Sequence, residues 1–368
     1  MINYPEGIRS RNIDGINGLN MHILEAGYDT SDRPLILLLH GFPELAFSWR
    51  KVIKPLADKG FHVVAPDLRG YGKTLGGNSN YDGDISQYEM SNLVIDVISL
   101  VYALDKNSVH CLIGHDFGSI LAAHSSLIRP DVFKKLILMS APFEGTSKIE
   151  NNLEDKKSNI HKELAALAKP RKHYQWYYSE KFANDDMMKC EQGLKSFFRA
   201  YYHVKSADWK QNNPYKLNSW SAIELAKLPG YYIMDYNLNM AQQVNIDMPK
   251  EEEIKSCKWL PNDELDYYVK NFTETTFQGG LNYYRCMTND LSRNKLRLYS
   301  DMRISVPSIF IAGKSDWGIY QKPGAFENMQ KSILSNMLGT YLINGAGHWV
   351  QQEKPTEVLN VFYDFISR

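Results

Sequence analysis

Short apolar runs, each followed by a turn and a stretch with helical spacing, set the pattern of this chain. Residues 35–39 are apolar throughout, which predicts a strand buried on both faces. We predict further strands at residues 21–25, 62–65, 109–113, 135–139, 308–312 and 340–343, and helices at 47–58, 85–104, 119–128, 326–335 and 355–366. Strands that alternate with helices predict an α/β fold with a mostly parallel sheet covered on both sides.

The alternation stops for some 150 residues in the middle of the chain. Residues 145–300 show helical spacing and loops, and they hold 14 of the 23 tyrosines and 4 of the 7 tryptophans. Because the alternation resumes afterwards, this segment is predicted to be an insertion within one sheet domain. We therefore divide the chain into a first core part (1–143), a mainly helical, aromatic-rich cap (144–300) and a second core part (301–368).

Composition narrows the classes of function. The 368 residues are 43% hydrophobic and 23% charged, which is typical of a globular protein. Lys+Arg and Asp+Glu both number 42, so nothing indicates a nucleic-acid partner. The four cysteines form no CxxC pair and the ten histidines show no ligand spacing, so we expect no metal. No apolar run is long enough to span a bilayer and no leader pattern occurs, so we expect a soluble, cytoplasmic protein of unspecified oligomeric state.

One pentapeptide at the end of a predicted strand contains the candidate nucleophile: Gly114-His115-Asp116-Phe117-Gly118. It has the spacing of a nucleophile elbow, in which flanking glycines let a strand turn sharply into a helix. The central Asp116 carboxylate is ionised near neutral pH and can displace a leaving group from a saturated carbon. The product would be an ester that must then be hydrolysed. Taken alone, the pentapeptide fits a helix N-cap equally well.

Two further polar residues follow predicted strands. Asp316 and His348 come soon after the strands at 308–312 and 340–343. Because parallel strands present their carboxyl ends at one edge of a sheet, we expect Asp116, Asp316 and His348 to meet there. His348 could then deprotonate the water that attacks the ester, while Asp316 fixes the histidine tautomer. Glu144 follows another predicted strand and is an alternative to Asp316 as the acid.

Hydrolysis of such an ester creates an oxyanion on the Asp116 carboxyl group, which needs hydrogen-bond donors. We expect these to be the backbone N–H groups of Phe117, directly after the nucleophile, and of Phe42, in the turn after the strand at 35–39. The combination of elbow, turn, acid and histidine indicates a nucleophilic hydrolase and not a helix cap.

Four motifs resemble those of the epoxide hydrolases of the α/β-hydrolase superfamily, and the likeness extends over nearly the whole chain. They are His40-Gly41-Phe42-Pro43-Glu44, Asp67-Leu68-Arg69-Gly70-Tyr71-Gly72, the elbow, and Gly347-His348-Trp349-Val350-Gln351. The resemblance implies an α/β-hydrolase fold with an inserted cap. It also implies a cofactor-free reaction that converts an epoxide to a vicinal diol through an ester on Asp116.

The resemblance further assigns two tyrosines of the insertion. Tyr174 begins a Tyr-Gln-x-Tyr-aromatic run, and Tyr284 lies in Gly280-Leu281-Asn282-Tyr283-Tyr284-Arg285, where glycine replaces the family's proline. In the family these tyrosines donate hydrogen bonds to the epoxide oxygen, and a phenol with a pKa of about 10 can protonate an alkoxide. We expect an apolar or aromatic epoxide in a mostly buried pocket, bound by the neighbouring residues Trp176, Tyr177, Tyr283 and Trp349.

Two other functions stay open. A haloalkane or haloacid dehalogenase would use the same Asp116, but the resemblance places Phe117 where dehalogenases commonly have a halide-holding tryptophan. A catalytically silent, ligand-binding member of the fold would keep the pocket without turnover, and the intact set of Asp116, Asp316 and His348 argues against it.

Overall fold

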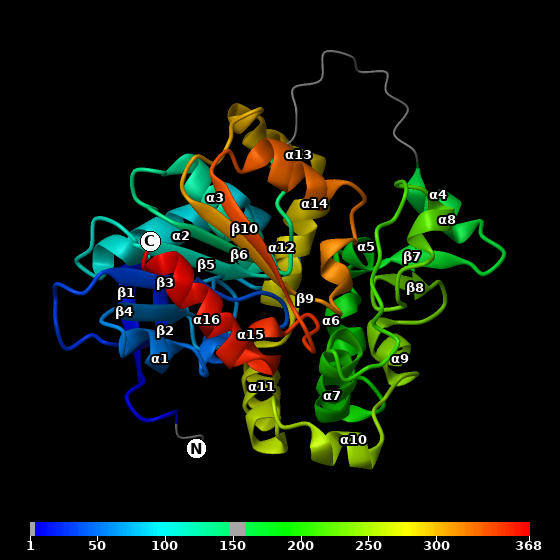
Figure 1. Ribbon diagram of the computed structural model, residues 1–368. Coiled ribbons are helices and arrows are strands. Elements are labelled where there is room, and N and C mark those ends of the chain that lie inside the picture. The colour runs from blue at the N-terminus through cyan, green and yellow to red at the C-terminus, as the bar shows by residue number, and fades with distance from the viewer. Residues whose placement is uncertain (1–3, 147–158) are drawn as a thin grey trace.

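An eight-stranded, mostly parallel sheet forms the centre of the computed structural model, which describes residues 4–146 and 159–368 (Figure 1). Its strand order is β1-β2-β4-β3-β5-β6-β9-β10. Only the β1–β2 and β2–β4 pairs are antiparallel. The strands are β1 (Arg9–Ile16), β2 (Leu19–Ala26), β3 (Leu35–Leu39), β4 (His62–Pro66), β5 (Cys111–His115), β6 (Leu136–Met139), β9 (Ser308–Gly313) and β10 (Met337–Ile343).

The central strands are buried along their whole length. Every residue of β3, β4, β5 and β6 is buried, as expected for parallel strands covered on both faces. All seven predicted strands occur, with ends that differ by at most three residues. The sequence pattern missed β1, because this edge strand is largely polar and only its last residue, Ile16, is buried.

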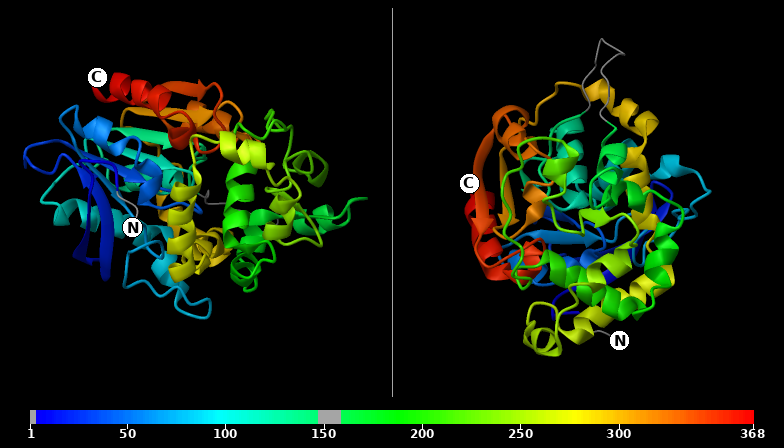
Figure 2. Two further views of the ribbon diagram at one scale, coloured as in Figure 1. Left: turned by 90° about the horizontal axis from the view of Figure 1, so that it is seen from below. Right: turned by 90° about the vertical axis from the view of Figure 1, so that its right-hand side faces the viewer.

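Helices cover both faces of the sheet, with α1 and α16 on one side and α2 and α3 on the other (Figure 2). Two predicted helices are each divided. The helix expected at 47–58 becomes a 3₁₀ turn and a short helix, and that at 85–104 breaks where Glu89 is extended. The elements are η1 (Ala46–Trp49), α1 (Ile53–Ala57), η2 (Ile85–Tyr88), α2 (Met90–Ala103), α3 (Phe117–Ile128), η4 (Trp317–Ile319), α14 (Ala325–Asn328), the π-helical η5 (Met329–Ile333), α15 (Val350–Glu353) and α16 (Pro355–Ile366).

Between β6 and β9 the described residues form helices and one small antiparallel sheet of β7 (Arg171–His173) and β8 (Ile233–Asp235), which the sequence pattern did not predict. Most of these elements lie beside the core sheet, at the right of Figure 1. Residues 147–158 of the predicted insertion lie outside the described residues, and its division from the core at 143/144 and 300/301 stays a prediction. The helices are α4 (Ile160–Ala165), α5 (Tyr174–Tyr178), α6 (Ala183–Met188), α7 (Gly193–Lys205), α8 (Ala222–Leu225), α9 (Met240–Asn245), α10 (Glu251–Ser256), α11 (Asn262–Thr275), α12 (Gln278–Thr288), α13 (Asp290–Lys295) and η3 (Leu296–Tyr299).

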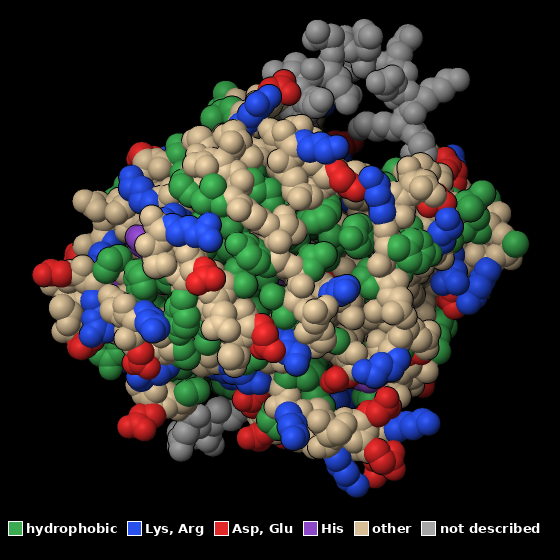
Figure 3. Space-filling view, in the orientation of Figure 1, with side chains coloured by type: hydrophobic (Ala, Val, Ile, Leu, Met, Phe, Trp, Pro, Cys, Tyr) green, Lys and Arg blue, Asp and Glu red, His purple; other side chains and the backbone are tan. Residues whose placement is uncertain are grey.

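Buried tyrosines join the insertion to the core. The Tyr202 hydroxyl on α7 donates to the carbonyl oxygen of Pro43 at 3.0 Å, and the Tyr283 hydroxyl on α12 donates to that of Arg69 at 2.9 Å. Outside this interface, basic and acidic side chains are interspersed over the face drawn in Figure 3. Within residues 4–146 and 159–368, no helix is both long and apolar enough to cross a membrane.

Candidate active site

Asp116 lies at the turn between β5 and α3, with φ 53° and ψ −119°. A positive φ is unfavourable for a residue with a side chain, so the surrounding structure must hold this conformation. The flanking glycines permit the necessary close approach. A Cβ atom on Gly114 would lie 2.0 Å from the carbonyl oxygen of Gly118, and one on Gly118 would lie 2.2 Å from that of Leu39. The local sequence therefore produces the expected elbow.

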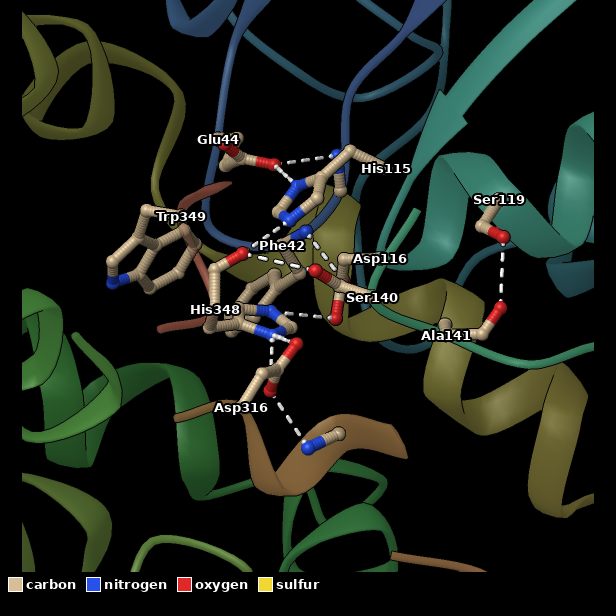
Figure 4. A network of polar contacts seen from close by, with 12 residues as sticks. Phe42, Glu44, His115, Asp116, Ser119, Ser140, Ala141, Asp316, His348 and Trp349 are labelled. Carbon is tan, nitrogen blue, oxygen red and sulfur yellow. Dashed lines mark hydrogen bonds and ion pairs between the residues drawn. The ribbon is translucent and has the colours of Figure 1, made fainter. Parts of the chain in front are cut away.

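The turn after β3 packs directly against the Asp116 side chain (Figure 4). The backbone N–H of Phe42 donates to Asp116 Oδ1 at 3.0 Å. Gly41 makes this approach possible, because a Cβ atom there would lie 2.3 Å from Asp116 Cβ. Phe117 is the first residue of α3, so its backbone N–H has no acceptor within the helix. The Phe42 N–H is therefore a backbone donor next to the carboxylate, and the role of the Phe117 N–H in the oxyanion hole stays a prediction.

His348 lies between two carboxylates (Figure 4). Its Nε2 is 3.2 Å from Asp116 Oδ2, and its Nδ1 is 3.1 and 3.2 Å from the two oxygens of Asp316. The backbone N–H of Gly318 donates to Asp316 Oδ1 at 2.7 Å and fixes that side chain. The side chains of His348 and Asp316 are each 1% exposed and that of Asp116 is 14% exposed. This geometry lets His348 exchange a proton next to Asp116 while Asp316 orients the ring.

Both carboxylates are ionised despite their burial. Burial opposes ionisation of Asp116, but its hydrogen bond to His348 and the nearby positive charges keep its pKa well below the usual range. Burial also opposes ionisation of Asp316, whose pKa is lowered by the charge and hydrogen bond of His348. Asp116 is therefore available as an anionic nucleophile at neutral pH.

Tyr174 on α5 and Tyr284 on α12 bring their rings to 5.9 Å from each other, centroid to centroid. Burial, followed by the charge of Asp116, raises the pKa of both hydroxyls well above its usual value, so both are protonated donors. The Tyr174 hydroxyl donates to Gln321 Oε1 at 2.9 Å and accepts from Gln175 Nε2 at 3.2 Å. Within the described part of the chain, the Tyr284 hydroxyl forms no hydrogen bond with a protein group.

A family model described as the alpha/beta hydrolase fold matches residues 34–355. The chain belongs to the α/β-hydrolase family. It is 28% identical over 354 residues to epoxide hydrolase A of Mycobacterium tuberculosis, covering 95% of each chain. It is likewise 28% identical over 366 residues to epoxide hydrolase 2 of Siraitia grosvenorii, covering 96% of each. The solved structure of a potato epoxide hydrolase variant is 30% identical, with a TM-score of 0.73 over 98% of this chain and 99% of that one. The predicted fold and the resemblance to epoxide hydrolases are confirmed.

In this α/β hydrolase, Tyr283 and Trp349 use their polar atoms to bind the protein itself. The Tyr283 hydroxyl donates to the carbonyl oxygen of Arg69, as described above, and Trp349 Nε1 donates to that of Tyr202 at 2.9 Å. Both side chains are at most 1% exposed. Their predicted contact with substrate, which stays a prediction, can involve only the faces and edges of the rings.

Trp176 and Tyr177 lie on α5, between Tyr174 and Tyr178 in the sequence. Trp176 packs against the rings of His161 and His173, with centroids 4.4 and 5.0 Å away. The Tyr177 hydroxyl donates to Asp186 Oδ2 at 2.8 Å. Both residues contact other parts of the insertion, and their role in substrate binding stays a prediction.

Of the two candidate acids, only Asp316 contacts His348. The Glu144 carboxylate pairs with Lys322, and its side chain is 42% exposed. This exposure is typical of a surface ion pair. Among residues 4–146 and 159–368, no group of three His, Cys, Asp or Glu side chains is placed to hold a metal ion.

A buried ion pair that the sequence reasoning missed supports the backbone of His348. His115 Nδ1 lies 2.5 Å from Glu44 Oε2, and its Nε2 lies 2.7 Å from the carbonyl oxygen of His348 (Figure 4). Because both ring nitrogens face acceptors, the ring is positioned to donate twice, as an imidazolium. Burial opposes that charge, but Glu44 raises the pKa of His115. Both residues lie in motifs that resemble those of epoxide hydrolases, and this was the sequence signal that could have revealed the ion pair.

Lys205, at the end of α7, is a second residue that affects the site and that the sequence reasoning missed. Its side chain is 4% exposed, and its ammonium lies over the rings of Tyr201, Tyr232 and Trp349 at 5.4, 5.2 and 5.5 Å. Its charge helps to lower the pKa of Asp116. Its carbonyl oxygen also accepts a 2.8 Å hydrogen bond from the backbone N–H of His348. No local sequence signal could reveal contacts between segments so far apart.

Proposed function

We propose that this protein hydrolyses an epoxide to a vicinal diol, with Asp116 as the nucleophile. One observation carries the proposal: a mostly buried, ionised carboxylate at the elbow lies 3.2 Å from His348, and its charge acts on two protonated tyrosines of the insertion. The names of the relatives agree with this chemistry.

In the first step, a carboxylate oxygen of Asp116 attacks one ring carbon, and the bond from that carbon to the epoxide oxygen breaks. The departing alkoxide is a poor leaving group, so it needs a proton or a strong hydrogen bond. Tyr284 and Tyr174 supply these. The product is a hydroxyalkyl ester of Asp116.

In the second step, His348 removes a proton from a water molecule, and the resulting hydroxide attacks the ester carbonyl carbon. The backbone N–H groups of Phe42 and Phe117 stabilise the oxyanion, and Asp316 stabilises the imidazolium. As this intermediate collapses, the His348 imidazolium protonates the departing diol oxygen, and the proton of the new Asp116 carboxyl group returns to the tyrosine that gave one up, which regenerates the Asp116 carboxylate. The many aromatic side chains of the insertion favour an apolar or aromatic epoxide as the substrate.

The test combines turnover with isotope labelling. Purified protein is incubated with styrene oxide, trans-stilbene oxide and cyclohexene oxide, and the diols are quantified by mass spectrometry. Asp116→Ala is the inactive control. A single turnover in ¹⁸O-labelled water should give unlabelled diol and label in Asp116, because the first oxygen delivered comes from the carboxylate.

Three outcomes would contradict the proposal. Labelled diol in the first turnover would mean direct attack by water. Halide release from haloalkanes without diol formation from epoxides would indicate a dehalogenase. Diol formation no faster than with Asp116→Ala would leave a ligand-binding member of the fold.

A further inference from the structure

The two tyrosines whose pKa values the charge of Asp116 raises differ in what their hydroxyl groups bind. The Tyr174 proton is already donated, to Gln321 Oε1 at 2.9 Å, and its oxygen already accepts from Gln175 Nε2 at 3.2 Å. The Tyr284 hydroxyl has no such protein partner within the described residues. Tyr284 is therefore ready to donate to a substrate oxygen, whereas Tyr174 must first give up an existing hydrogen bond.

Gln321 belongs to the core and not to the insertion. It lies in the loop between η4 and α14, five residues after Asp316, so the same loop holds the acid and the residue that binds Tyr174. The neighbouring Lys322 forms an ion pair with Glu144. The hydrogen bond from Tyr174 to Gln321 thus joins the insertion to the core loop that also holds Asp316.

Gln175 and Gln321 act on the Tyr174 hydroxyl in opposite ways. The hydrogen bond that Tyr174 accepts from Gln175 polarises the phenol and lowers its pKa, against the larger effects of burial and Asp116. This makes Tyr174 a better donor. The acceptor on Gln321 competes with the substrate oxygen for the same proton, because a phenol has only one proton to donate.

We propose that Gln321 is a positioning residue that holds the Tyr174 proton in the resting enzyme, so that ring opening must exchange this hydrogen bond for one to the substrate oxygen. The inference rests on the proposed function. It makes Tyr284 the first donor and Tyr174 a second donor whose contribution depends on how strongly residue 321 accepts.

The experiment is a double-mutant cycle on the rate of ester formation. Rapid quenching and mass spectrometry follow alkylation of Asp116 by trans-stilbene oxide at pH 7. Gln321→Glu supplies a charged, stronger acceptor, and Gln321→Met removes the acceptor at similar length. Each substitution at position 321 is made alone and in combination with Tyr174→Phe. The combination with Tyr284→Phe is the matched control.

Gln321→Glu should slow alkylation about tenfold, because hydrogen bonds to a carboxylate are roughly twice as strong as neutral ones. Gln321→Met should speed it about threefold to fivefold, since a neutral hydrogen bond no longer has to be broken. Both effects should disappear in Tyr174→Phe and persist in Tyr284→Phe. A merely structural role of Gln321 would give no such selectivity.

Slowing by Gln321→Glu that persists in Tyr174→Phe would reflect the added charge and would overturn the inference. Equal rates for all residues at position 321 would overturn it too. In both cases the parent protein would still form the ester on Asp116, so the proposed function would stand. Absence of the ester in the parent would overturn both proposals.

Discussion

Two tyrosines that are adjacent in sequence, Tyr283 and Tyr284, have opposite surroundings. The Tyr283 hydroxyl is bound to the carbonyl oxygen of Arg69, and its ring packs edge-on against Phe117 at 4.7 Å. The Tyr284 ring instead packs against Phe42, with 5.4 Å between centroids, and the charge of Asp116 acts on its hydroxyl. Since successive helix positions point in different directions, α12 uses one residue to anchor the insertion and the next for chemistry.

Tyr284→Phe should slow alkylation of Asp116 about a hundredfold, a typical loss for one donor to a developing oxyanion. Tyr283→Phe is the matched control. It should change that rate by less than about twofold but lower stability by about 1 kcal/mol, because the Arg69 carbonyl loses its partner. Rapid-quench kinetics and urea unfolding measure the two effects. Equal alkylation rates for Tyr284→Phe and the parent would remove Tyr284 from the mechanism.

His348→Gln should separate the two chemical steps. The variant retains Asp116 and both tyrosines, so alkylation continues, but no base activates the hydrolytic water. Intact-protein mass spectrometry after incubation with styrene oxide should therefore show a stable adduct with the mass of one substrate molecule. Asp116→Ala should show none. Unmodified His348→Gln protein, after exposure to an epoxide that the parent hydrolyses, would contradict this assignment of steps.

At the scale of residues, the sequence predicted those site residues whose positions are set by the ends of parallel strands. Asp116, Asp316 and His348 meet because β5, β9 and β10 run in parallel and end at one edge. Lys205 and Gln321 could not be predicted, because each reaches the site through contacts between the insertion and the core.

At the scale of elements, the elbow depends on close packing of α3 against β3. A Cβ atom on Gly118 would meet the carbonyl oxygens of Leu39 and His40 at 2.2 and 2.6 Å. Both oxygens belong to the backbone of a central strand or its end, so they cannot move aside as a flexible side chain can. The glycine thus sets the distance between nucleophile and oxyanion turn.

Gly118→Ala should lower the free energy of unfolding by about 3 kcal/mol, a large overpacking penalty, and should abolish most turnover. Gly77→Ala is a milder control, because its Cβ would first meet the Arg69 side chain at 3.3 Å. Thermal unfolding and diol formation report the two effects. If Gly118→Ala kept the parent's stability and rate, the elbow would not depend on this contact.

The sequence pattern predicted the fully buried strands and missed the exposed or very short ones. β3 and β5 were found because buried strands of a parallel sheet are apolar throughout. β1 was missed because polar residues fill an edge strand that faces solvent, and β7 and β8 because three residues give too little pattern. The described helices of the insertion follow from helical spacing, but their packing does not.

At the scale of the whole molecule, equal numbers of acidic and basic residues mean that acid adds positive charge to a formally neutral protein. One buried carboxylate makes this uptake of protons important for stability. Glu25 on β2 is fully buried and pairs with Arg9 at 2.6 Å, His62 at 2.9 Å, and Arg11. Burial raises its pKa, but the hydrogen bonds from His62, Arg11 and Arg9 outweigh this and lower the pKa to about 2.

Glu25 should therefore make the stability of the protein depend on pH in acid. The unfolded chain takes up the proton near the usual pKa of 4.5, whereas the folded protein does so only near 2. The stabilisation is thus fully present above about pH 4.5 and is lost as the pH falls towards 2. Glu25→Gln should cost about 2 kcal/mol at pH 7, once screening at the half-exposed arginines is considered. Urea unfolding between pH 2.5 and 7 should show this difference shrinking with acidity, while the exposed Glu6→Gln changes nothing. A difference between Glu25→Gln and the parent that stays constant over this range would mean that packing, and not charge, accounts for the effect of Glu25.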